Sequence, residues 1–218
     1  MEKEGNNIVL ILSHRGYWKT EPEKNSLLAF ERSFASGFGT ETDIRDRGGE
    51  LVISHDMANE RSVKAKDFFR LCGRFDNCLP LALNVKADGL QDELMLLLEK
   101  FDVKNYFVFD MSVPDALIYL RQKFNVYTRQ SEHESDPPFY AEAKGVWLDS
   151  FYGGWLDEKT LNGHLKNGKK VCIVSPELHG RKHLNFWGAL KVLGAAESKN
   201  IMLCTDHPVS AREFFYGK

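Results

Sequence analysis

Short apolar runs alternate along the chain with segments whose apolar residues recur at helical spacing. The apolar runs predict strands, because buried parallel strands are short and almost continuously hydrophobic. We expect strands at Ile8–Leu12, Gly39–Ile44, Leu81–Val85, Tyr106–Phe109, Val126–Thr128, Gly145–Leu148, Val171–Val174 and Ile201–Cys204. We expect helices between them, at Asn25–Ser36, Leu90–Phe101, Val113–Lys123, Asp157–Lys166, Leu184–Ala195 and Ser210–Tyr216.

Strands that alternate with helices in this way indicate an α/β protein whose parallel sheet is covered on both faces. Eight such strands predict a compact (β/α)8 TIM barrel. The fifth repeat is the exception, because residues 130–138 are polar and include Pro137 and Pro138, so its helix is expected to be short or missing. A length of 218 residues fits a single barrel domain that spans residues 1–218.

The composition is that of an ordinary globular protein, with 43% hydrophobic residues and a formal net charge of −2. This charge gives no electrostatic reason to expect nucleic acid or an anionic membrane surface as a partner. The N-terminal residues are polar, and the apolar run that follows them is too short for a signal peptide or a membrane span. We therefore expect a cytoplasmic protein without stable membrane association.

The four cysteines fit a reducing compartment. Cys172 and Cys204 lie in predicted strands, where cysteine behaves as a small buried apolar residue. Cys72 and Cys78 flank a short loop and could form a bridge if oxidised, but a reducing compartment argues against that bond. The sequence has no Cys-x-x-Cys pair, so the cysteines do not predict a zinc site.

A charged or titratable residue stands at or just past the end of every predicted strand. These residues are His14, Asp43, Lys86, Asp110, Arg129, Asp149, Glu177 and Asp206. Active groups of a barrel lie at the carboxyl ends of its strands, so we expect these side chains around one mouth. The short apolar run 51–54 lies in an excursion between the second and third barrel strands. If this excursion folds back over the mouth, it brings His55 there as well.

The stretch from Ser13 to Asp56 contains the residues best suited to chemistry. Glu41 and Asp43 are two residues apart on a predicted strand, so their carboxylates point to the same face. Paired carboxylates are typical ligands of a hard cation such as Mg²⁺ or Ca²⁺. His14 and His55 flank the pair at strand ends and can exchange protons near neutral pH.

The order and spacing of motifs in this stretch resemble those of the glycerophosphodiester phosphodiesterase family, within the phosphatidylinositol phospholipase C-like phosphodiesterases. The matching residues are His14-Arg15-Gly16, Asn25-Ser26, Ala29-Phe30, Gly37, Glu41-Thr42-Asp43 and His55-Asp56. The chain departs from the family at Lys24, where glutamate is usual, and at 47–49, where threonine-x-aspartate-glycine is commoner. The resemblance continues more weakly through the third strand, the seventh strand and a closing Thr205-Asp206-x-Pro208.

The resemblance implies a metal-dependent phosphoric diester hydrolase of lipid metabolism, which cleaves a small glycerol-type phosphodiester. His14 and His55 would share the acid and base roles, and a cyclic phosphate could form when the glycerol hydroxyl attacks its own phosphorus. Arg15 and Lys86 would neutralise charge on the phosphate. Asp56, beside His55, is expected to be a turn or cap residue.

The third strand carries the main departure at the metal site, since Asn84 stands where the family has a glutamate. One divalent cation, Mg²⁺ or Ca²⁺, would be held by Glu41, Asp43 and Asn84, because an amide oxygen can also bind a hard cation. Another carboxylate could compensate for the lost charge, and Asp110 and Glu177 are the candidates. Glu177 is otherwise expected to bind substrate or phosphate at the mouth.

Aromatic residues follow several strands and could form a wall for the alcohol part of the substrate. The candidates are Tyr17, Trp18, Phe151, Tyr152, Trp155, Phe186 and Trp187, of which Trp187 is the expected substrate contact. Two alternatives to the hydrolase stay open. One is a non-catalytic barrel that binds a phosphate ligand after its metal site has decayed. The other is a carbon–carbon lyase on the same barrel, for which the sequence contains no motif.

Overall fold

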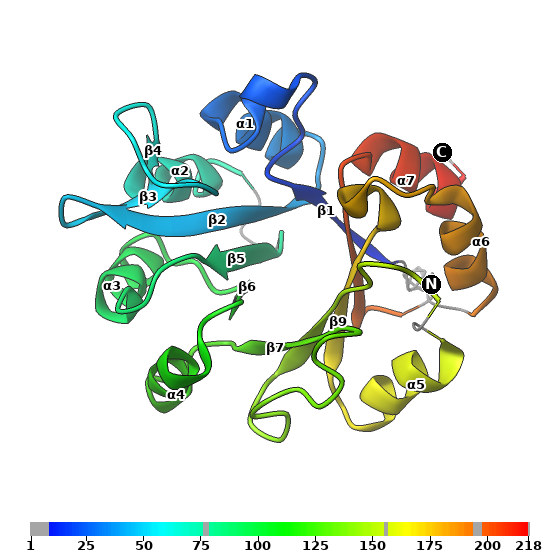
Figure 1. Cartoon of the computed structure of the whole chain (residues 1–218). Helices are drawn as coiled ribbons and strands as arrows, with labels where there is room; N and C mark the ends of the chain where they lie inside the picture. The colour runs from blue at the N-terminus through cyan, green and yellow to red at the C-terminus, as the bar shows by residue number, and fades with distance from the viewer. Residues whose placement is uncertain (1–8, 76–78, 155–156, 194–197, 218) are drawn as a thin grey trace, which may run out of the picture.

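The structure of the chain is a computed structural model, and it describes residues 9–75, 79–154, 157–193 and 198–217 (Figure 1). The strands are β1 (Leu10–His14), β2 (Gly39–Arg47), β3 (Glu50–Ile53), β4 (Val63–Lys64), β5 (Leu81–Val85), β6 (Tyr106–Phe109), β7 (Tyr127–Gln130), β8 (Gly145–Leu148), β9 (Lys170–Val174) and β10 (Ile201–Thr205). The helices are α1 (Leu27–Ala35), α2 (Ala65–Cys72), α3 (Gln91–Lys100), α4 (Val113–Arg121), α5 (Glu158–Lys166), α6 (Leu184–Val192) and α7 (Pro208–Tyr216). Short 3₁₀ turns cover Glu21–Glu23 and Pro176–His179.

The parallel strands form one curled sheet in the order β7-β8-β9-β10-β1-β2-β5-β6. Full ladders join neighbours within this order, but β6 and the start of β7 meet only through the parallel bridge between Val108 and Val126. The predicted α/β class is therefore confirmed. Of the predicted barrel, the structure shows the curled sheet of parallel strands. The expected bounds of three strands are exact, and those of the others differ by at most three residues at either end.

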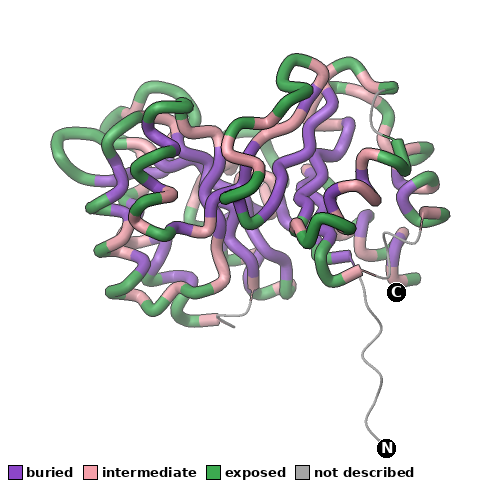
Figure 2. Tube along the Cα trace, turned by 90° about the horizontal axis from the view of Figure 1, so that it is seen from below, coloured by how far each residue is buried: buried purple, intermediate pink, exposed green. Residues whose placement is uncertain are grey.

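Helices cover the outside of the sheet (Figure 1). One apolar layer packs between α1–α4 and the strands around β5, where Phe30, Phe68 and Leu94 are fully buried. A second layer packs between α5–α7 and β8–β10 around Trp187. A trace coloured by burial shows the same arrangement, with buried strands inside and exposed residues on the outer helix faces and loops (Figure 2). Among the described residues, no helix combines the length and apolar character needed to cross a membrane.

The inside of the curled sheet is filled by side chains, as in known barrels. Phe107 stacks on Tyr127 at 3.8 Å between ring centroids, and Phe109 stacks on Trp147 at 3.9 Å. Cys172 belongs to the same cluster and is fully buried, as expected for a cysteine in a parallel strand. The expectation that Cys72 and Cys78 form no bridge cannot be compared with the structure, because Cys78 lies outside the described residues.

The excursion after β2 is more ordered than the sequence predicts. β2 extends past Ile44, and its end pairs with β3 in an antiparallel ladder from Ile44–Ile53 to Arg47–Glu50. β4 then pairs with β3, and α2 follows directly, although no helix was expected there. By contrast, the fifth repeat agrees with the prediction, since residues 131–144 between β7 and β8 contain turns and no helix.

Candidate active site

His14 ends β1 and is fixed from two sides. Its Nδ1 atom lies 2.7 Å from Oδ1 of Asp206, the first residue after β10. When Nδ1 carries the proton of this hydrogen bond, Nε2 is the nitrogen that faces Glu41 and can exchange a proton. Nε2 lies 3.9 Å from Oε2 of Glu41, the residue that pairs with His14 in the β1–β2 register. Burial opposes ionisation of Asp206, but the hydrogen bond and the charge of His14 outweigh it and lower the pKa of Asp206.

The Glu177 carboxylate holds Asp206 in place by accepting hydrogen bonds from Thr205 and from Asp206 itself. The hydroxyl of Thr205 donates to the Glu177 carboxylate, and the backbone N–H of Asp206 donates to the same oxygen at 3.2 Å. The other oxygen accepts from the hydroxyl of Ser175 at 2.5 Å. The Glu177 carboxylate, expected to bind substrate or phosphate, is therefore engaged by the protein, where it holds the loop that orients His14.

The turn after β1 needs glycine and places Arg15 over the next strand. Gly16 has a φ of +85°, and a side chain there would lie 2.8 Å from the Cβ of Ala29. Arg15 itself has a φ of +56°, and its backbone N–H donates to the carbonyl of Glu41 at 3.0 Å. Its Nε atom lies 3.3 Å from Oδ2 of Asp43. The His-Arg-Gly motif thus fixes α1 against β1 and directs the guanidinium to the carboxylates.

Asn25 is a site residue that the chemical argument from the sequence did not single out. Its amide N–H donates to Oδ2 of Asp43 at 2.8 Å, and its amide oxygen accepts from the hydroxyl of Thr42 at 2.9 Å. It also has a φ of +58° and precedes Ser26, whose hydroxyl caps α1. The start of α1 and the position of Asp43 are therefore coupled, and the only sequence signal was the Asn25-Ser26 pair of the family motif.

The two carboxylates of β2 are almost fully buried, Glu41 with 2% and Asp43 with 1% of their surface exposed. Burial raises the pKa of Glu41 well above its usual value, and the nearby Asp43 raises it further. Arg15 and Lys86 act in the opposite direction. Lys86 lies just past β5, with its Nζ atom 3.4 Å from Oδ1 of Asp43. The carboxylates therefore form a buried acidic centre with two cations beside it.

Two oxygen atoms in this centre accept no hydrogen bond, although one of them, Oδ1 of Asp43, forms an ion pair with Lys86. Asp43 and Asn84 are direct partners in the β2–β5 register, and Oδ1 of each is buried without a hydrogen bond from the described residues. Buried acceptors are normally satisfied, so such a pair indicates a missing ligand. Carboxylate and amide oxygens are ligands of Mg²⁺ and Ca²⁺. The residues therefore fit a hard divalent cation.

The described part of the chain contains no group of three or more His, Cys, Asp or Glu side chains placed to hold a metal. This agrees with the replacement of the third carboxylate by Asn84. The suggested substitutes do not fill its place, because the Asp110 carboxylate is paired with Arg129 at 2.5 Å and Glu177 is engaged under Asp206. The donor set is thus two carboxylates and one amide oxygen.

His55 lies on the excursion that borders the mouth. The backbone N–H of Ser54 donates to the carbonyl of Asp43 at 3.1 Å, which places the start of this loop beside the carboxylate strand. Nδ1 of His55 lies 2.8 Å from Oδ1 of Asp56, and 43% of the His55 side chain is exposed. Asp56 therefore contacts the imidazole, which is the less favoured of the two roles that its position beside His55 suggests. No interaction joins His55 to His14 or to the buried carboxylates in the described structure.

Trp187 does not line the mouth, and its predicted contact with substrate is wrong. It is fully buried in α6, where its indole N–H donates to the hydroxyl of Ser175 at 2.8 Å. Ser175 in turn donates to Glu177, so Trp187 helps to hold Ser175 and Glu177 in place after β9. Of the other aromatic candidates, Trp155 lies outside the described residues, whereas Tyr152 is 74% exposed.

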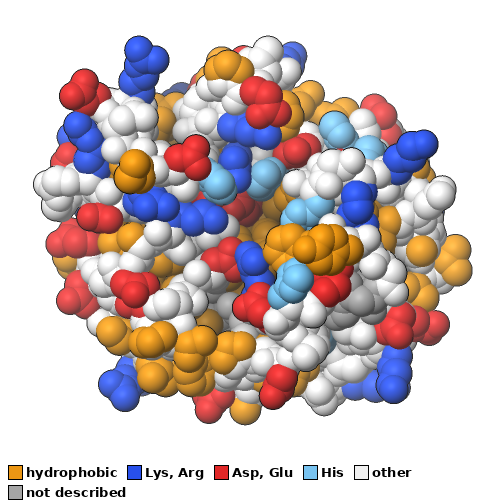
Figure 3. Space-filling view, in the orientation of Figure 1, with side chains coloured by type: hydrophobic (Ala, Val, Ile, Leu, Met, Phe, Trp, Pro, Cys, Tyr) orange, Lys and Arg blue, Asp and Glu red, His pale blue; other side chains and the backbone are white. Residues whose placement is uncertain are grey.

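A space-filling view shows histidine, basic and acidic side chains gathered over the centre of the sheet (Figure 3).

By sequence the chain matches no protein-family model and none of the curated proteins. Its fold is nevertheless similar to that of solved glycerophosphodiester phosphodiesterases. A structure from Galdieria sulphuraria, assigned to these enzymes, superimposes with a TM-score of 0.74 at 19% identity, over 96% of this chain and 98% of the other. A glycerophosphoryl diester phosphodiesterase from Parabacteroides distasonis gives 0.69 at 14% identity, over 97% and 87%.

A third neighbour is a phosphodiesterase from Oleispira antarctica in complex with the product sn-glycerol-3-phosphate, with a TM-score of 0.66 at 12% identity, over 96% of this chain and 97% of the other. A Ca²⁺-dependent phosphatidylinositol-specific phospholipase C from Streptomyces antibioticus is more distant, with a TM-score of 0.58 at 11% identity, over 95% of this chain and 96% of the other. The chain therefore has the fold shared by these phosphoric diester hydrolases, in agreement with the resemblance read from its motifs.

Proposed function

We propose that the chain is a metal-dependent phosphodiesterase that cleaves a small glycerol-type phosphodiester. The observation that carries this proposal is the pair of unsatisfied oxygens on Asp43 and Asn84, next to Glu41 and to a histidine oriented by Asp206. This arrangement combines cation ligands with a proton acceptor at one strand end. The fold shared with glycerophosphodiester phosphodiesterases supports it.

Glu41, Asp43 and Asn84 would hold one divalent cation, Mg²⁺ or Ca²⁺. When bound, the cation supplies Lewis-acid polarisation of a phosphoryl oxygen and lowers the cost of charge on the phosphate. Arg15 and Lys86 lie at 3.3 and 3.4 Å from the Asp43 carboxylate and contribute positive charge at the same place. Arginine can pair two phosphate oxygens in a forked geometry, whereas lysine acts as a point charge.

The two histidines divide the proton transfers. Nε2 of His14 accepts the proton of the attacking glycerol hydroxyl, and Asp206 stabilises the imidazolium that results. The hydroxyl oxygen forms a bond to its own phosphorus, and the bond to the other alcohol breaks. His55 gives its proton to the departing alkoxide. The products are a free alcohol and a cyclic phosphate, which water then opens when His14 and His55 exchange roles.

The finer features of the proposal rest on smaller observations. We propose that the curled sheet is a closed barrel, because the bridge between Val108 and Val126 already joins β6 to β7.

We place the enzyme in the cytoplasm and in the turnover of lipid-derived diesters. Free, buried cysteines at 72, 172 and 204 fit a reducing compartment, and a net charge of −2 offers nothing to hold an anionic membrane.

A panel of glycerophosphodiesters tests the assignment, with Mg²⁺ or Ca²⁺ added to protein that has been treated with a chelator. We expect turnover only with added cation, and a loss of at least about a hundredfold in rate for His14→Ala and for His55→Ala. His133→Ala is the matched control, because His133 is exposed and its ring packs against Phe151 and Tyr152, away from the carboxylates of β2. Unchanged turnover in both test variants would disprove the catalytic roles.

A second candidate is a non-catalytic barrel that binds phosphate ligands. The observation in its favour is Asn84, which removes one negative charge from the cation site. Calorimetric titration with inorganic phosphate separates the two candidates. Phosphate binding that is independent of Mg²⁺ and Ca²⁺, together with no turnover of any diester, would favour the binding protein.

A further inference from the structure

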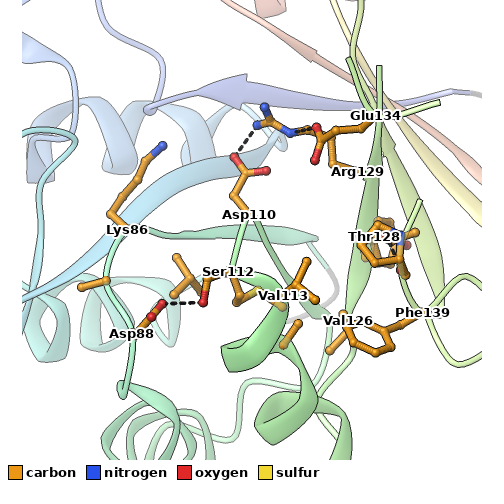
Figure 4. A pocket seen from close by; sticks show the side chains of 16 residues that line it. Lys86, Asp88, Asp110, Ser112, Val113, Val126, Thr128, Arg129, Glu134 and Phe139 are labelled. Carbon is orange, nitrogen blue, oxygen red and sulfur yellow. Dashed lines mark hydrogen bonds and ion pairs between the residues drawn. The ribbon is translucent and has the colours of Figure 1, made fainter. Parts of the chain in front are cut away.

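A cleft of about 510 Å³ opens beside the candidate active site, between the loops that follow β5 and β6 and the connection from β7 to β8 (Figure 4). It lies where the fifth repeat lacks a helix, so α4 and β7 have an uncovered flank there. Its volume is within the range of about 300–1,000 Å³ that is usual for small-molecule sites. The missing helix thus has a structural consequence, which is a side chamber next to the mouth.

Lys86 connects the cleft to the proposed phosphate site. It lines the cleft, and its Nζ atom is also 3.4 Å from Oδ1 of Asp43. Lys86 and Asp110 rise from neighbouring strand ends toward Arg129 (Figure 4). A phosphate bound at Lys86 would therefore have one substituent directed into this cleft.

The walls of the cleft combine hydrogen-bonding groups with apolar surface. Ser112 donates to Asp88 at 2.9 Å on one side, whereas Val113 and Phe139 present carbon on the other. Arg129 stands at the end nearest Lys86, where its guanidinium is shared between the carboxylates of Asp110 and Glu134. Such a mixed lining suits a molecule that carries several hydroxyl groups around a carbon skeleton.

The charges within the cleft largely cancel at the end next to the phosphate site. Arg129 pairs with Asp110 at 2.5 Å and lies 3.7 Å from Glu134, while Lys86 adds a second positive charge. A cationic alcohol such as choline gains no net attraction at that end, and at the other end the Asp88 carboxylate is exposed and already accepts from Ser112, so solvent screens its attraction for a cation. An alkyl chain would have to pass this ion-pair cluster and would end near the Asp88 carboxylate, which is unfavourable for apolar carbon.

Two strained residues line the same cleft. Asp110 has a φ of +68° and Phe139 a φ of +55°, a region that residues with side chains rarely occupy. Such conformations are unfavourable and cluster at ligand sites, where the surrounding structure maintains them. Here the strain directs the Asp110 carboxylate to Arg129 and places Phe139 at the wall of the cleft.

We propose that this cleft is the subsite for the alcohol of the diester, and that this alcohol is an uncharged polyol or sugar. The inference rests on the proposed function, because it takes the phosphate to bind at Lys86. Specificity for the alcohol is therefore set by the loops around β5, β6 and β7, and a bulky side chain at position 113 should block it. Val113 is suited to this test because 53% of its surface is exposed, so a larger side chain does not disturb the core.

Calorimetric titration tests the subsite without requiring turnover. The probes share a phosphate and differ in the alcohol: myo-inositol 1-phosphate, phosphocholine, dodecyl phosphate and sn-glycerol 3-phosphate. We expect myo-inositol 1-phosphate to bind at least about tenfold more tightly than phosphocholine or dodecyl phosphate. Val113→Trp should remove this preference, whereas Ile118→Trp, on an exposed part of α4 outside the cleft, should retain it. Asp88→Ala is a second variant that removes a polar wall group without adding bulk, and it should weaken only the inositol phosphate.

Tightest binding of phosphocholine or of dodecyl phosphate would overturn the inference, and so would a preference for inositol phosphate that survives both Val113→Trp and Asp88→Ala. Failure of the proposed function gives a different result. In that case no diester is cleaved with Mg²⁺ or Ca²⁺, yet the binding preference and its loss in Val113→Trp persist. Equal affinity for all four probes combined with diester cleavage would reject the subsite and leave the phosphodiesterase intact.

Discussion

The two sides of the mouth carry similar buried polar residues, but these residues differ in the hydrogen bonds that their side-chain oxygens accept. On the side formed by β1, β2 and β5, Oδ1 of Asp43 and Oδ1 of Asn84 have no hydrogen-bond donor among the described residues. On the side formed by β7, β8 and β9, Asp149 accepts from Nε2 of His179 at 2.6 Å and from the backbone N–H of Ser150 at 2.8 Å. Glu132 accepts from Ser150 and from the N–H groups of the three residues that follow.

This difference separates binding residues from structural ones. An acceptor that the protein itself satisfies has little left to offer a ligand, whereas a buried acceptor without a donor costs about 1–3 kcal/mol until something binds it. Asp43 and Asp149 both stand at the carboxyl end of a predicted strand and are indistinguishable by that position alone. The difference in their hydrogen bonds supports placing the proposed cation on the β2 side, whereas on the β8 side the protein itself binds the carboxylate.

The largest expected difference is between two single variants, in which the aspartate of one side or of the other is replaced by asparagine. Asp43→Asn should lower turnover by at least about a hundredfold and weaken cation binding, because it removes a buried charge next to Glu41. A hundredfold loss corresponds to about 2.8 kcal/mol. Asp149→Asn should change turnover by less than about threefold and should mainly lower the thermal midpoint. Steady-state kinetics, calorimetric titration with Mg²⁺ and thermal melts check both. Equal loss of activity in the two variants would remove the distinction between the two sides.

Asn84→Glu should have a smaller effect in the favourable direction. It restores a third carboxylate beside Asp43, and one charge at this distance is worth up to roughly 4 kcal/mol at an effective dielectric of 20 before desolvation is subtracted. A tenfold gain in affinity for Mg²⁺ needs only about 1.4 kcal/mol of this. Asn84→Gln is the uncharged control of similar length.

Calorimetric titration with Mg²⁺ and an activity assay of Asn84→Glu check this prediction, and two results would contradict it. An unchanged affinity would show that Asn84 does not contact the cation. Loss of activity in a folded Asn84→Glu protein would show that the amide serves the substrate instead.

Glu177→Gln should reduce turnover by several-fold without a change in KM. The carboxylate accepts from Thr205 and from the N–H of Asp206, so an amide at this position disturbs the residue that orients His14. The effect is indirect and therefore smaller than that of removing a cation ligand. Asp206→Asn should lower kcat more strongly, because it alters the direct partner of His14. A rise in KM with unchanged kcat in Glu177→Gln would instead indicate that Glu177 contacts substrate.

The smallest effect is a pH-dependent change in stability for Glu132→Gln. Burial opposes ionisation of Glu132, but backbone N–H groups of residues 151 and 152 outweigh it and lower its pKa from 4.5 to about 2. The folded chain therefore binds fewer protons than the unfolded chain between these values, so stability increases with pH in this window. The difference in free energy of unfolding between wild type and variant should be full above about pH 4.5 and should shrink toward pH 2. Denaturant unfolding at pH 3 and pH 6 measures it, and an equal difference at both values would contradict the role of ionisation.

The sequence predicted the barrel strands well because each is a short apolar run bounded by polar residues, as in Leu81–Val85 and Gly145–Leu148. It missed α2, whose N-cap Lys64 makes no side-chain hydrogen bond and therefore gives no start signal. It also ended β2 too early. Residues 45–47 are polar, and they are in a strand only because β3 pairs with them outside the barrel.

The site was predictable where it depends on local motifs and unpredictable where it depends on packing. Glu41 and Asp43 share a face because of their spacing, and Asn84 joins them through strand register. The contact between His14 and Asp206 requires β1 to lie next to β10, which no local pattern encodes. Trp187 was misassigned because the sequence alone does not show which side of α6 packs against the sheet.

The pairing of His14 with Asp206 also bears on when activity can arise during protein synthesis. The two residues are separated by 192 positions, so a ribosome completes the histidine long before its partner. At about 5–20 residues per second, the delay is roughly 10–40 s. A nascent chain arrested before β10 lacks both the carboxylate that orients the imidazole and the strand that pairs with β1. Activity should therefore appear only after the last strand has been made.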